Sequence, residues 1–301
     1  MIDYKKIIKS QKLRFKILNL LSWVPDKIMI KMQYKIKTGR KLDLKNPKRF
    51  TEKLQWYKLY YRDPLMKKCA DKYEVRDYVK SKGLENILNE LYGVYDKPEE
   101  IDFDKLPNKF VLKTTDGSGG NNIIVCEDKQ KMNIKKTIKQ IKEWQKNNIK
   151  KPAGREWCYE GLKSRIICEK VLPRDNRNDL PDYKFFCFNG KVEFLYVMID
   201  YTDNHSNGKM GFYDRNFKKL PFNRNDFKKI DFNIKKPINF EKMINYAEIL
   251  SKDFPHVRVD FYNINGNIVF GELTFYNTSG YVSFTPDEYD YKIGEKMHLY
   301  K

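Results

Sequence analysis

The chain has 301 residues, of which 41% are hydrophobic and 15% aromatic, and its formal net charge is +20. This many apolar side chains can form a core, so the composition excludes an intrinsically disordered protein. The lysines are spread along the chain, which fits either a polyanionic partner or a solvated basic surface, and no zinc-finger or RNA-binding motif accompanies them, so sequence-specific nucleic-acid binding is not expected.

A basic N-terminal segment, residues 1–45, comes first, and its most apolar stretch is Phe15–Met32. Pro25, Asp26 and Lys27 interrupt this stretch, so it is too short and too charged to span a bilayer, and no signal-peptide cleavage site follows it. Two interpretations stay open: an amphipathic helix lying on an anionic membrane, or a helix docked on the protein core.

Residues 46–105 form a predicted helical region. Thr51 is expected to cap a helix with the sequence TEKLQWYKLYYRD, in which apolar residues recur at helical spacing. A second helix is expected in DKYEVRDYVKSKG, ending at Gly83. The stretch KPEEIDFDKLP, which contains Pro98 and Pro107, is predicted to be a surface link into the next region.

Residues 106–173 begin with a strand, a glycine loop and a second strand, FVLKTTDGSGGNNIIV, at Phe110–Val125. The loop matches neither the G-K-[ST] nor the dinucleotide pattern, so it is either an ordinary hairpin loop or another kind of phosphate cradle. In a cradle, its backbone N–H groups and the ammonium of Lys113 would contact the same phosphates. An amphipathic helix, Met132–Asn148, and a buried strand in SRIICEKVLP are expected next.

Residues 174–301 begin with a polar loop that runs to Asp182. A hairpin is predicted around Asn189-Gly190, then a helix in EKMINYAEILSKDF, then a second strand pair in HVRVDFYNINGNIVFGELTF. Antiparallel hairpins separated by helices, without alternating βαβ units, predict an α+β fold.

The second strand pair carries three charged residues of interest. Arg258 and Asp260 share one face of their strand, because side chains alternate, while apolar residues form the other face. Glu272 lies in a strand that is otherwise apolar, where a carboxylate is costly unless it is paired or bound to a cation. Two carboxylates facing one another would suit Mg²⁺, and a structural ion pair with Arg258 is the alternative.

The register of this pair decides whether the two carboxylates meet. A two-residue Asn265-Gly266 turn with a regular ladder would send Glu272 to the face opposite Asp260. We therefore predict either a loop with an odd number of residues or a bulge near Gly271.

Taken in chain order, Lys113, the DGSGG loop, Glu169-Lys170-Val171-Leu172, Arg258-Val-Asp260 and Glu272 resemble the ATP-grasp fold. The segments NPKRFTEKLQWYKLYYRDP, DYKFFCFNGK and FGELTFYNTSG narrow the resemblance to the TupA-like ATP-grasp proteins of bacterial cell-surface polysaccharide pathways, over nearly the whole chain. The resemblance implies two α+β subdomains that clasp ATP, with a helical N-terminal extension.

The resemblance also implies roles for individual residues. Arg258 and Lys184 would be catalytic, and Mg²⁺ would be held by Asp260, Glu272 and Asn277. The chain has Glu272-Leu-Thr274 where many relatives have E-x-N, so Thr274 is an alternative third ligand. The residues implied for nucleotide binding are Lys72, Lys113, Gly117, Ser118, Gly119, Gly120, Glu169, Lys170, Val171 and Leu172. The acid that would bind ribose is either Asp175 or Asp179.

The implied function is an ATP-dependent carboxylate–amine ligase that forms ADP through an acyl phosphate, in surface polysaccharide or capsule biosynthesis. The acceptor would be a small molecule or a polysaccharide-linked group bearing a carboxylate or an amine, selected by the loops Arg174–Asp182 and Tyr201–Met210. A glycosyltransferase is the alternative, although the one D-x-D motif, Asp102-Phe-Asp104, reads as a solvated turn. A silent binder of anionic polymers or membranes is a third reading.

Cysteine and histidine usage bears on location. The five cysteines include no C-x-x-C pair and the three histidines are scattered, so reduced thiols are expected and zinc is not. We expect a cytoplasmic protein, with the inner face of the membrane as the alternative that the basic segment leaves open.

Overall fold

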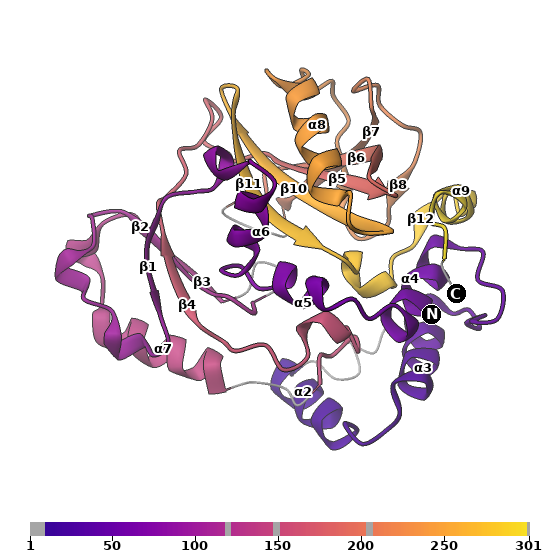
Figure 1. Cartoon of the computed structure of the whole chain (residues 1–301), viewed down its shortest axis with the longest axis horizontal. Coiled ribbons are helices and arrows are strands. Elements are labelled where there is room, and N and C mark those ends of the chain that lie inside the picture. Colours follow the sequence, from indigo (N-terminus) through magenta and orange to yellow (C-terminus); the bar gives the residue numbers. More distant parts are fainter. Residues whose placement is uncertain (1–9, 118–121, 147–150, 203–206, 300–301) are drawn as a thin grey trace.

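The structure is a computed structural model that describes residues 10–117, 122–146, 151–202 and 207–299. Two sheets dominate it, an antiparallel sheet of four strands and a sheet of six strands that is antiparallel except for the β7–β9 pair, with helices packed on both (Figure 1). Figure 1 shows α7 along the smaller sheet, α8 on the larger sheet, and α5 and α6 between the two. The predicted α+β class is confirmed.

Helices form most of the N-terminal third. They are α2 (Gln11–Leu20), α3 (Asp26–Thr38), α4 (Phe50–Tyr60), α5 (Pro64–Ala70) and α6 (Val75–Ser81), followed by the 3₁₀ turn η1 (Glu85–Ile87). One face of α3 docks on the protein through Ile30 and Tyr34, which form a small apolar cluster with Leu42. No helix in the described part of the chain is long and apolar enough to cross a membrane.

The helix α4 was predicted, but its cap was not. Thr51 lies inside the helix, so its prediction as the capping residue is wrong. The first N–H groups are instead bound by carboxylates: Glu52 accepts from the backbone N–H of Arg49, and Asp290 accepts from the N–H of Thr51 at 3.0 Å. Asp290 belongs to the C-terminal helix α9 (Glu288–Lys296), so this cap joins α4 to α9.

The smaller sheet has the strand order β1-β4-β2-β3. Its strands are β1 (Leu91–Tyr95), β2 (Phe110–Thr114), β3 (Ile123–Cys126) and β4 (Ile166–Glu169), and α7 (Ile134–Lys146) packs against it. The two predicted strands that flank the glycine loop and the helix that follows them are therefore confirmed. The β1 strand comes from the stretch expected to be helical and pairs with β4.

The stretch between β1 and β2 is not the surface link that was predicted. It folds into two 3₁₀ turns, η2 (Pro98–Glu100) and η3 (Phe103–Lys105). Ile101, Phe103 and Leu106 are buried in the core of the smaller sheet, while the acidic residues between them face solvent. The charged residues masked this alternation in the sequence.

The larger sheet has the order β11-β10-β5-β6-β7-β9. Its strands are β5 (Asp182–Phe188), β6 (Lys191–Ile199), β7 (Lys209–Asp214), β9 (Lys228–Lys229), β10 (His256–Ile264) and β11 (Asn267–Thr274). A separate pair joins β8 (Asn223–Arg224) to β12 (Phe284–Thr285). The predicted Asn189-Gly190 hairpin connects β5 to β6, with both turn residues at positive φ as a two-residue type I′ turn requires.

The helix α8 (Phe240–Ser251) covers one face of the larger sheet. Phe185 of β5 contacts Phe240 of α8, with ring centroids 5.9 Å apart. Because side chains alternate along a strand, the neighbouring Lys184 points to the opposite face. Asp260 lies directly opposite Lys184 in the ladder, so both occupy the face away from α8.

Candidate functional site

A bulge at Gly271 sets the register of β10 and β11. The connection is a two-residue Asn265-Gly266 turn that pairs Ile264 with Asn267, so the predicted odd-numbered loop is wrong. The predicted alternative is confirmed: the ladder shifts between Asp260, which faces Glu272, and Phe261, which faces Phe270. Glycine suits the bulge because a Cβ at Gly271 would lie 3.1 Å from the carbonyl oxygen of Asp260.

Arg258 is the centre of a buried polar cluster on this face. Its Nε donates to Asp260 Oδ1 at 2.7 Å, and its Nη2 donates to Asp260 Oδ2 at 2.6 Å and to Glu272 Oε1 at 2.8 Å. Its Nη1 donates to Asn277 Oδ1 at 2.7 Å and to the hydroxyl of Tyr196 at 3.2 Å. Arg258 therefore pairs with both carboxylates, as the ion-pair alternative requires.

Lys184 extends the cluster along β5. Its Nζ lies 2.5 Å from a carboxylate oxygen of Asp182 and 2.5 Å from one of Asp260. Burial raises the pKa of Asp182 to about 6, against the opposing charge of Lys184. Burial would lower the pKa of Lys184, but the two aspartates outweigh it and hold that pKa well above its usual range.

Three oxygen ligands converge on one point of the cluster. Besides the two carboxylates, Thr274 Oγ1 lies 3.0 Å from Arg258 Nη2 and donates to Glu272 Oε1 at 2.8 Å. Burial would raise the pKa of Glu272, but Arg258, Lys184 and Lys72 outweigh it and lower the pKa to about 2. Carboxylate and hydroxyl oxygens are hard ligands of the kind that Mg²⁺ prefers, so this set of side chains fits Mg²⁺ chemically.

Asn277 stands slightly apart from this point. It lies in the 3₁₀ turn η7 (Asn277–Gly280), its Oδ1 faces Nη1 of Arg258 rather than Nη2, and its buried Nδ2 has no hydrogen-bond partner. The geometry thus favours Thr274 over Asn277 as the third oxygen beside the carboxylates. Within the described ranges, no group of three or more His, Cys, Asp or Glu residues is arranged as a metal site.

Two further lysines, Lys72 and Lys113, are linked to the cluster through their charges. The backbone N–H of Lys72 donates to Thr115 O at 3.0 Å, which fixes the turn between α5 and α6 at the end of β2, and the Lys72 ammonium bonds the carbonyl of Gly117. Burial lowers the pKa of Lys72, Glu272 opposes this shift, and Lys113 reinforces it. Lys72 is thus electrostatically coupled both to Lys113 and to the polar cluster.

Lys113 is held in place by the end of β4. Its Nζ lies 2.9 Å from Glu169 Oε2, and Arg76 Nη1 lies 3.3 Å from the other oxygen of that carboxylate. Of the predicted glycine loop, Gly117 lies within the described residues and contacts Lys72, whereas Ser118, Gly119 and Gly120 lie outside them. The structure therefore brings together Lys72, Lys113, Gly117 and Glu169.

The remaining predicted hinge residues follow β4. Lys170 is exposed and pairs with Glu90 at 3.1 Å, while Val171 and Leu172 are half-buried. Lys170 and Leu172 line a cavity of about 350 Å³ whose other wall includes Ile268 and Val269 of β11. This cavity lies between the predicted hinge and the larger sheet.

The two candidates for a ribose-binding acid are engaged elsewhere. Asp179 accepts from the backbone N–H of Asp200 at 2.7 Å and from the Thr202 hydroxyl at 2.8 Å. Asp175 accepts from the N–H of Arg177 at 2.8 Å. Both carboxylates therefore stabilise the 174–182 loop and its contact with Asp200 and Thr202.

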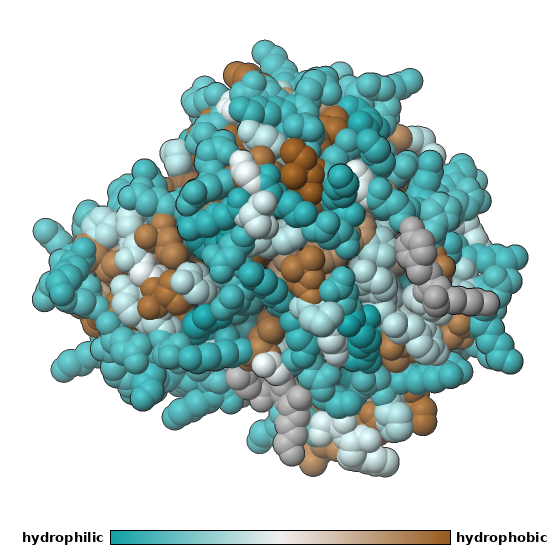
Figure 2. Space-filling view, viewed as in Figure 1, coloured by the Kyte–Doolittle hydropathy of each residue, from teal (hydrophilic) through white to brown (hydrophobic). Residues whose placement is uncertain are grey.

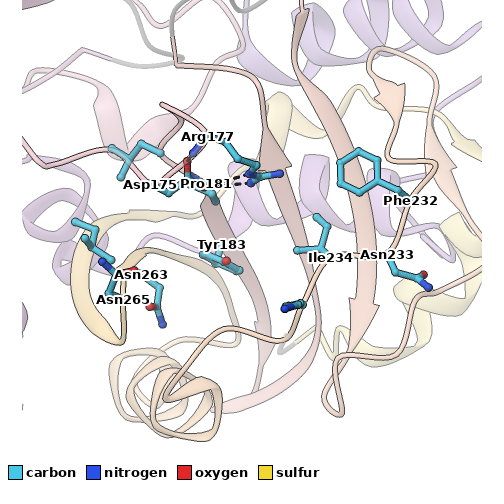
Figure 3. A pocket seen from close by; sticks show the side chains of 12 residues that line it. Asp175, Arg177, Pro181, Tyr183, Phe232, Asn233, Ile234, Asn263 and Asn265 are labelled. Atoms are coloured by element: carbon cyan, nitrogen blue, oxygen red, sulfur yellow. Dashed lines mark hydrogen bonds and ion pairs between the residues drawn. The ribbon is translucent and has the colours of Figure 1, made fainter.

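A second cavity, of about 370 Å³, lies on the other face of the larger sheet. Figure 3 shows Asp175, Arg177 and Tyr183 on one side of it and Asn263 and Asn265 of the β10–β11 turn on another. Tyr183 alternates with Lys184 along β5, so this cavity opens toward the α8 side and away from the polar cluster. We assign it no role in the site.

Sequence reasoning missed Lys58, whose hydrogen bonds stabilise the turn beside the site. Lys58 is fully buried and donates to Gly154 O at 2.8 Å, Ser279 O at 2.7 Å and Gln55 Oε1 at 3.0 Å. It thereby fixes the turn after Asn277, where Thr278 and Ser279 have positive φ. A signal existed, because Lys58 lies on the apolar face of the α4 pattern, where a lysine needs buried acceptors.

Comparison with known proteins supports a family assignment. A family model described as TupA-like ATPgrasp matches residues 52–298. No curated protein gives a significant match.

Solved structures resemble the chain at a coarser level. D-alanine–D-alanine ligase from Bacillus anthracis aligns with a TM-score of 0.43 and 18% identity, covering 69% of this chain and 57% of that one. Phosphoribosylamine–glycine ligase from Thermotoga maritima gives 0.42 and 13%, covering 70% and 48%. L-amino acid ligase from Bacillus licheniformis gives 0.42 and 13%, covering 73% and 45%. The chain thus spans about half the length of these proteins.

Proposed function

Because the chain belongs to the TupA-like ATPgrasp family, we propose that it is an ATP-dependent ligase that joins a carboxylate to an amine. The observation that carries the proposal is that one part of the structure holds both oxygen atoms suited to a metal ion and ammonium groups suited to phosphates. Asp260, Glu272 and Thr274 offer oxygens to a cation, and Lys72 and Lys113 offer ammonium groups to phosphates. A nucleoside triphosphate with its metal ion needs both.

The lysines and the glycine loop would bind the phosphates. Lys72 and Lys113 would contact the α and β phosphates, and the Gly117–Gly120 loop would exclude water from the reacting γ phosphate. Glu169–Leu172 would hold the adenine, and the cavity lined by Lys170 and Leu172 offers space for it. Glu169 already orients Lys113 through its ion pair.

Asp260 and Glu272, with Thr274 or Asn277, would hold Mg²⁺, which supplies positive charge that neutralises the phosphate oxygens. Arg258 remains tied to Asn277 and Tyr196 through Nη1, so its guanidinium stays in the site. It would stabilise the transferring phosphoryl group and the later oxyanion, with Lys184 assisting at the γ phosphate.

The proposed chemistry needs no side-chain nucleophile. A substrate carboxylate oxygen attacks the γ phosphorus and ADP leaves; the amine then attacks the acyl phosphate carbonyl, loses a proton and releases inorganic phosphate. Two side chains that could suggest another mechanism are inert here. Burial lowers the pKa of His256 to about 3 and raises that of the Cys187 thiol to about 12, so both are neutral in the core.

The biological setting is proposed from the family alone: synthesis of bacterial surface polysaccharide or capsule, in the cytoplasm or at the inner face of the membrane. The acceptor would bear a carboxylate or an amine, free or linked to a polysaccharide. The loops Arg174–Asp182 and Tyr201–Met210 remain our candidates for selecting it, although residues 203–206 of the second lie outside the described ranges.

The glycosyltransferase alternative lacks a metal motif in a suitable place. Asp102 and Asp104 are exposed on the η3 turn, and Asp102 pairs with Lys105 at 2.8 Å. These carboxylates face solvent beside the smaller sheet rather than the polar cluster. The cluster itself contains the buried Arg258 and Lys184, and the charge of Lys72 interacts with its Glu272; this set of cations favours phosphoryl transfer.

The purified chain tests the proposal when it is incubated with MgATP and mixtures of small carboxylates and amines. We expect ADP release that requires both a carboxylate and an amine and stops when Mg²⁺ is chelated. Nucleotide sugars offered in place of ATP should remain intact. Release of a nucleoside diphosphate from a sugar donor, with no ADP from any mixture, would favour the glycosyltransferase instead.

The role of Lys58 gives a second expected result. Lys58→Met should lower the free energy of unfolding by about 1–3 kcal/mol, because buried acceptors lose their donor, and should also reduce ADP formation because the turn beside Asn277 loosens. Lys53→Met is the matched control: Lys53 lies on the same helix and donates to Gly294 O and Met297 O, each at 2.8 Å, away from the cluster. Urea denaturation and ADP release measured on both variants should show that only Lys58→Met lowers turnover. Equal losses would make Lys58 purely structural.

A further inference from the structure

Helix α3 carries an apolar stripe that the described residues of the protein leave exposed. Ile28, Met32 and Ile36 are exposed by 52%, 48% and 37%, and they recur every four residues, so they lie along one side of the helix. The residues that dock α3 on the core, among them Ile30 and Tyr34, lie on the opposite side. The stripe is therefore a different face of α3 from the one that packs on the core.

The end of α2 and the turn between α2 and α3 add two more exposed apolar side chains. Leu20 is 74% exposed and Trp23 is 79% exposed. Arg155, which is itself buried, holds this turn by donating to Leu21 O at 2.7 Å, to Val24 O at 3.2 Å and to Asp26 Oδ1 at 2.9 Å. Since the backbone is tied down on both sides of Trp23, the exposure of this indole is built into the fold.

Lysines run beside the apolar stripe. Lys27, Lys31 and Lys35 are all exposed and each precedes one of its members, so they form a second stripe about 100° around the helix. Lys27 and Lys31 make no ion pair with any described residue. Asp26, the one acidic residue between Ser10 and Leu42, is neutralised by Lys151 and Arg155.

We infer that this surface, formed by Leu20, Trp23, Ile28, Met32 and Ile36 with the flanking lysines, binds an anionic lipid bilayer. Apolar side chains would enter the boundary between headgroups and acyl chains while the ammonium groups contact lipid phosphates. In Figure 2, apolar side chains are visible along the lower edge of the molecule, where Figure 1 shows α2 and the start of α3.

Charge decides between a membrane and a second copy of the chain. Two copies meeting through this surface would bring their lysine stripes together, and each chain carries a net charge of +20. An anionic bilayer instead complements the lysines and accepts the apolar stripe together with the amphipathic Trp23. The inference does not depend on the reaction, so ATP turnover and membrane binding can fail separately.

Cosedimentation of the full chain with vesicles tests the inference. We expect binding to phosphatidylglycerol vesicles, little binding to phosphatidylcholine vesicles, and steep loss with added salt, because exposed charges are screened within about 10 Å at roughly 0.1 M ionic strength. The double variant Lys27→Gln/Lys31→Gln should weaken binding by at least about tenfold, since each lysine near an anionic surface contributes roughly a factor of five. Lys135→Gln/Lys139→Gln, two exposed lysines at the same spacing on α7, is the matched control and should bind as the unmodified protein does.

The apolar stripe is tested in the same assay. Ile28→Ser/Met32→Ser should lower binding at least tenfold, whereas Val125→Ser/Ile238→Ser, at positions exposed by 52% and 64% elsewhere, should not. Absence of binding to phosphatidylglycerol at low salt would overturn the inference. So would equal losses in the α3 and control variants, or concentration-dependent dimers that only the α3 variants abolish.

Discussion

Asp260→Asn is expected to lower ATP-dependent turnover by about 10² to 10³-fold in a protein that still folds. The carboxylate of Asp260 accepts two hydrogen bonds from Arg258 and lies 2.5 Å from Lys184, so it fixes both cationic side chains and offers an oxygen to the metal. Asparagine keeps the shape but removes the charge and presents an N–H₂ group to one of these donors. Losing one preorganised charged group in such a site typically costs several kcal/mol of transition-state stabilisation.

The measurement is ADP formation at saturating MgATP, with circular dichroism to confirm folding. Asp253→Asn serves as the control, because Asp253 also pairs with a lysine, Lys82, and its other partner is the Tyr78 hydroxyl rather than a residue of the cluster. Turnover within threefold of the unmodified protein in a folded Asp260→Asn variant would remove Asp260 from the site.

Lys113→Met should weaken nucleotide binding by on the order of 30-fold, because a hydrogen bond to a charged group is typically worth about 2 kcal/mol or more. The fold should survive, since Glu169 keeps its ion pair with Arg76 when Lys113 is removed. Isothermal titration with a non-hydrolysable ATP analogue gives the affinity directly. Lys109→Met is the matched control on the same side of β2, where Lys109 pairs with Glu127 on the surface at 3.2 Å.

Equal affinities of the two lysine variants would show that Lys113 does not contact the phosphates. A selective loss in Lys113→Met, with Lys109→Met unchanged, would support the phosphate-binding role that the strand-end position first indicated.

Much of the architecture could be predicted because it is encoded locally. Three predicted features depend on residues close in the chain: the Asn189-Gly190 turn, the shared face of Arg258 and Asp260, and the amphipathic helix behind the glycine loop. The order of the motifs then predicted the ATP-grasp fold and the family. The bulge at Gly271 could also be predicted, because a regular ladder after the Asn265-Gly266 turn would have placed Asp260 and Glu272 on opposite faces of the sheet.

What could not be predicted depends on residues far apart in the chain. Asp290 completes the cap of α4 from the far end of the chain, and the carbonyl groups that accept hydrogen bonds from the buried Lys58 belong to Gly154 and Ser279. Arg258 had one predicted partner but binds both carboxylates, Thr274, Asn277 and Tyr196, because three strands and a turn converge on it. Pattern reading gives the face on which such a side chain lies, but not which of several neighbours it contacts.

The prediction for the stretch between β1 and β2 was wrong for a different reason. Its charged residues alternate with Ile101 and Phe103, and proline and acidic content outweighed that alternation in the sequence interpretation. Short irregular segments bury apolar side chains without any helical or strand period, so only tertiary packing shows that they belong to the core.

The most direct test of the central claim follows one oxygen atom. A carboxylate substrate that supports ADP release is labelled with a heavy oxygen isotope in its carboxyl group, and the inorganic phosphate formed with the product is analysed by mass spectrometry. Activation through an acyl phosphate transfers one carboxylate oxygen to phosphorus, so the account predicts one labelled oxygen in each phosphate. Phosphate that carries no label while amide product accumulates would contradict it.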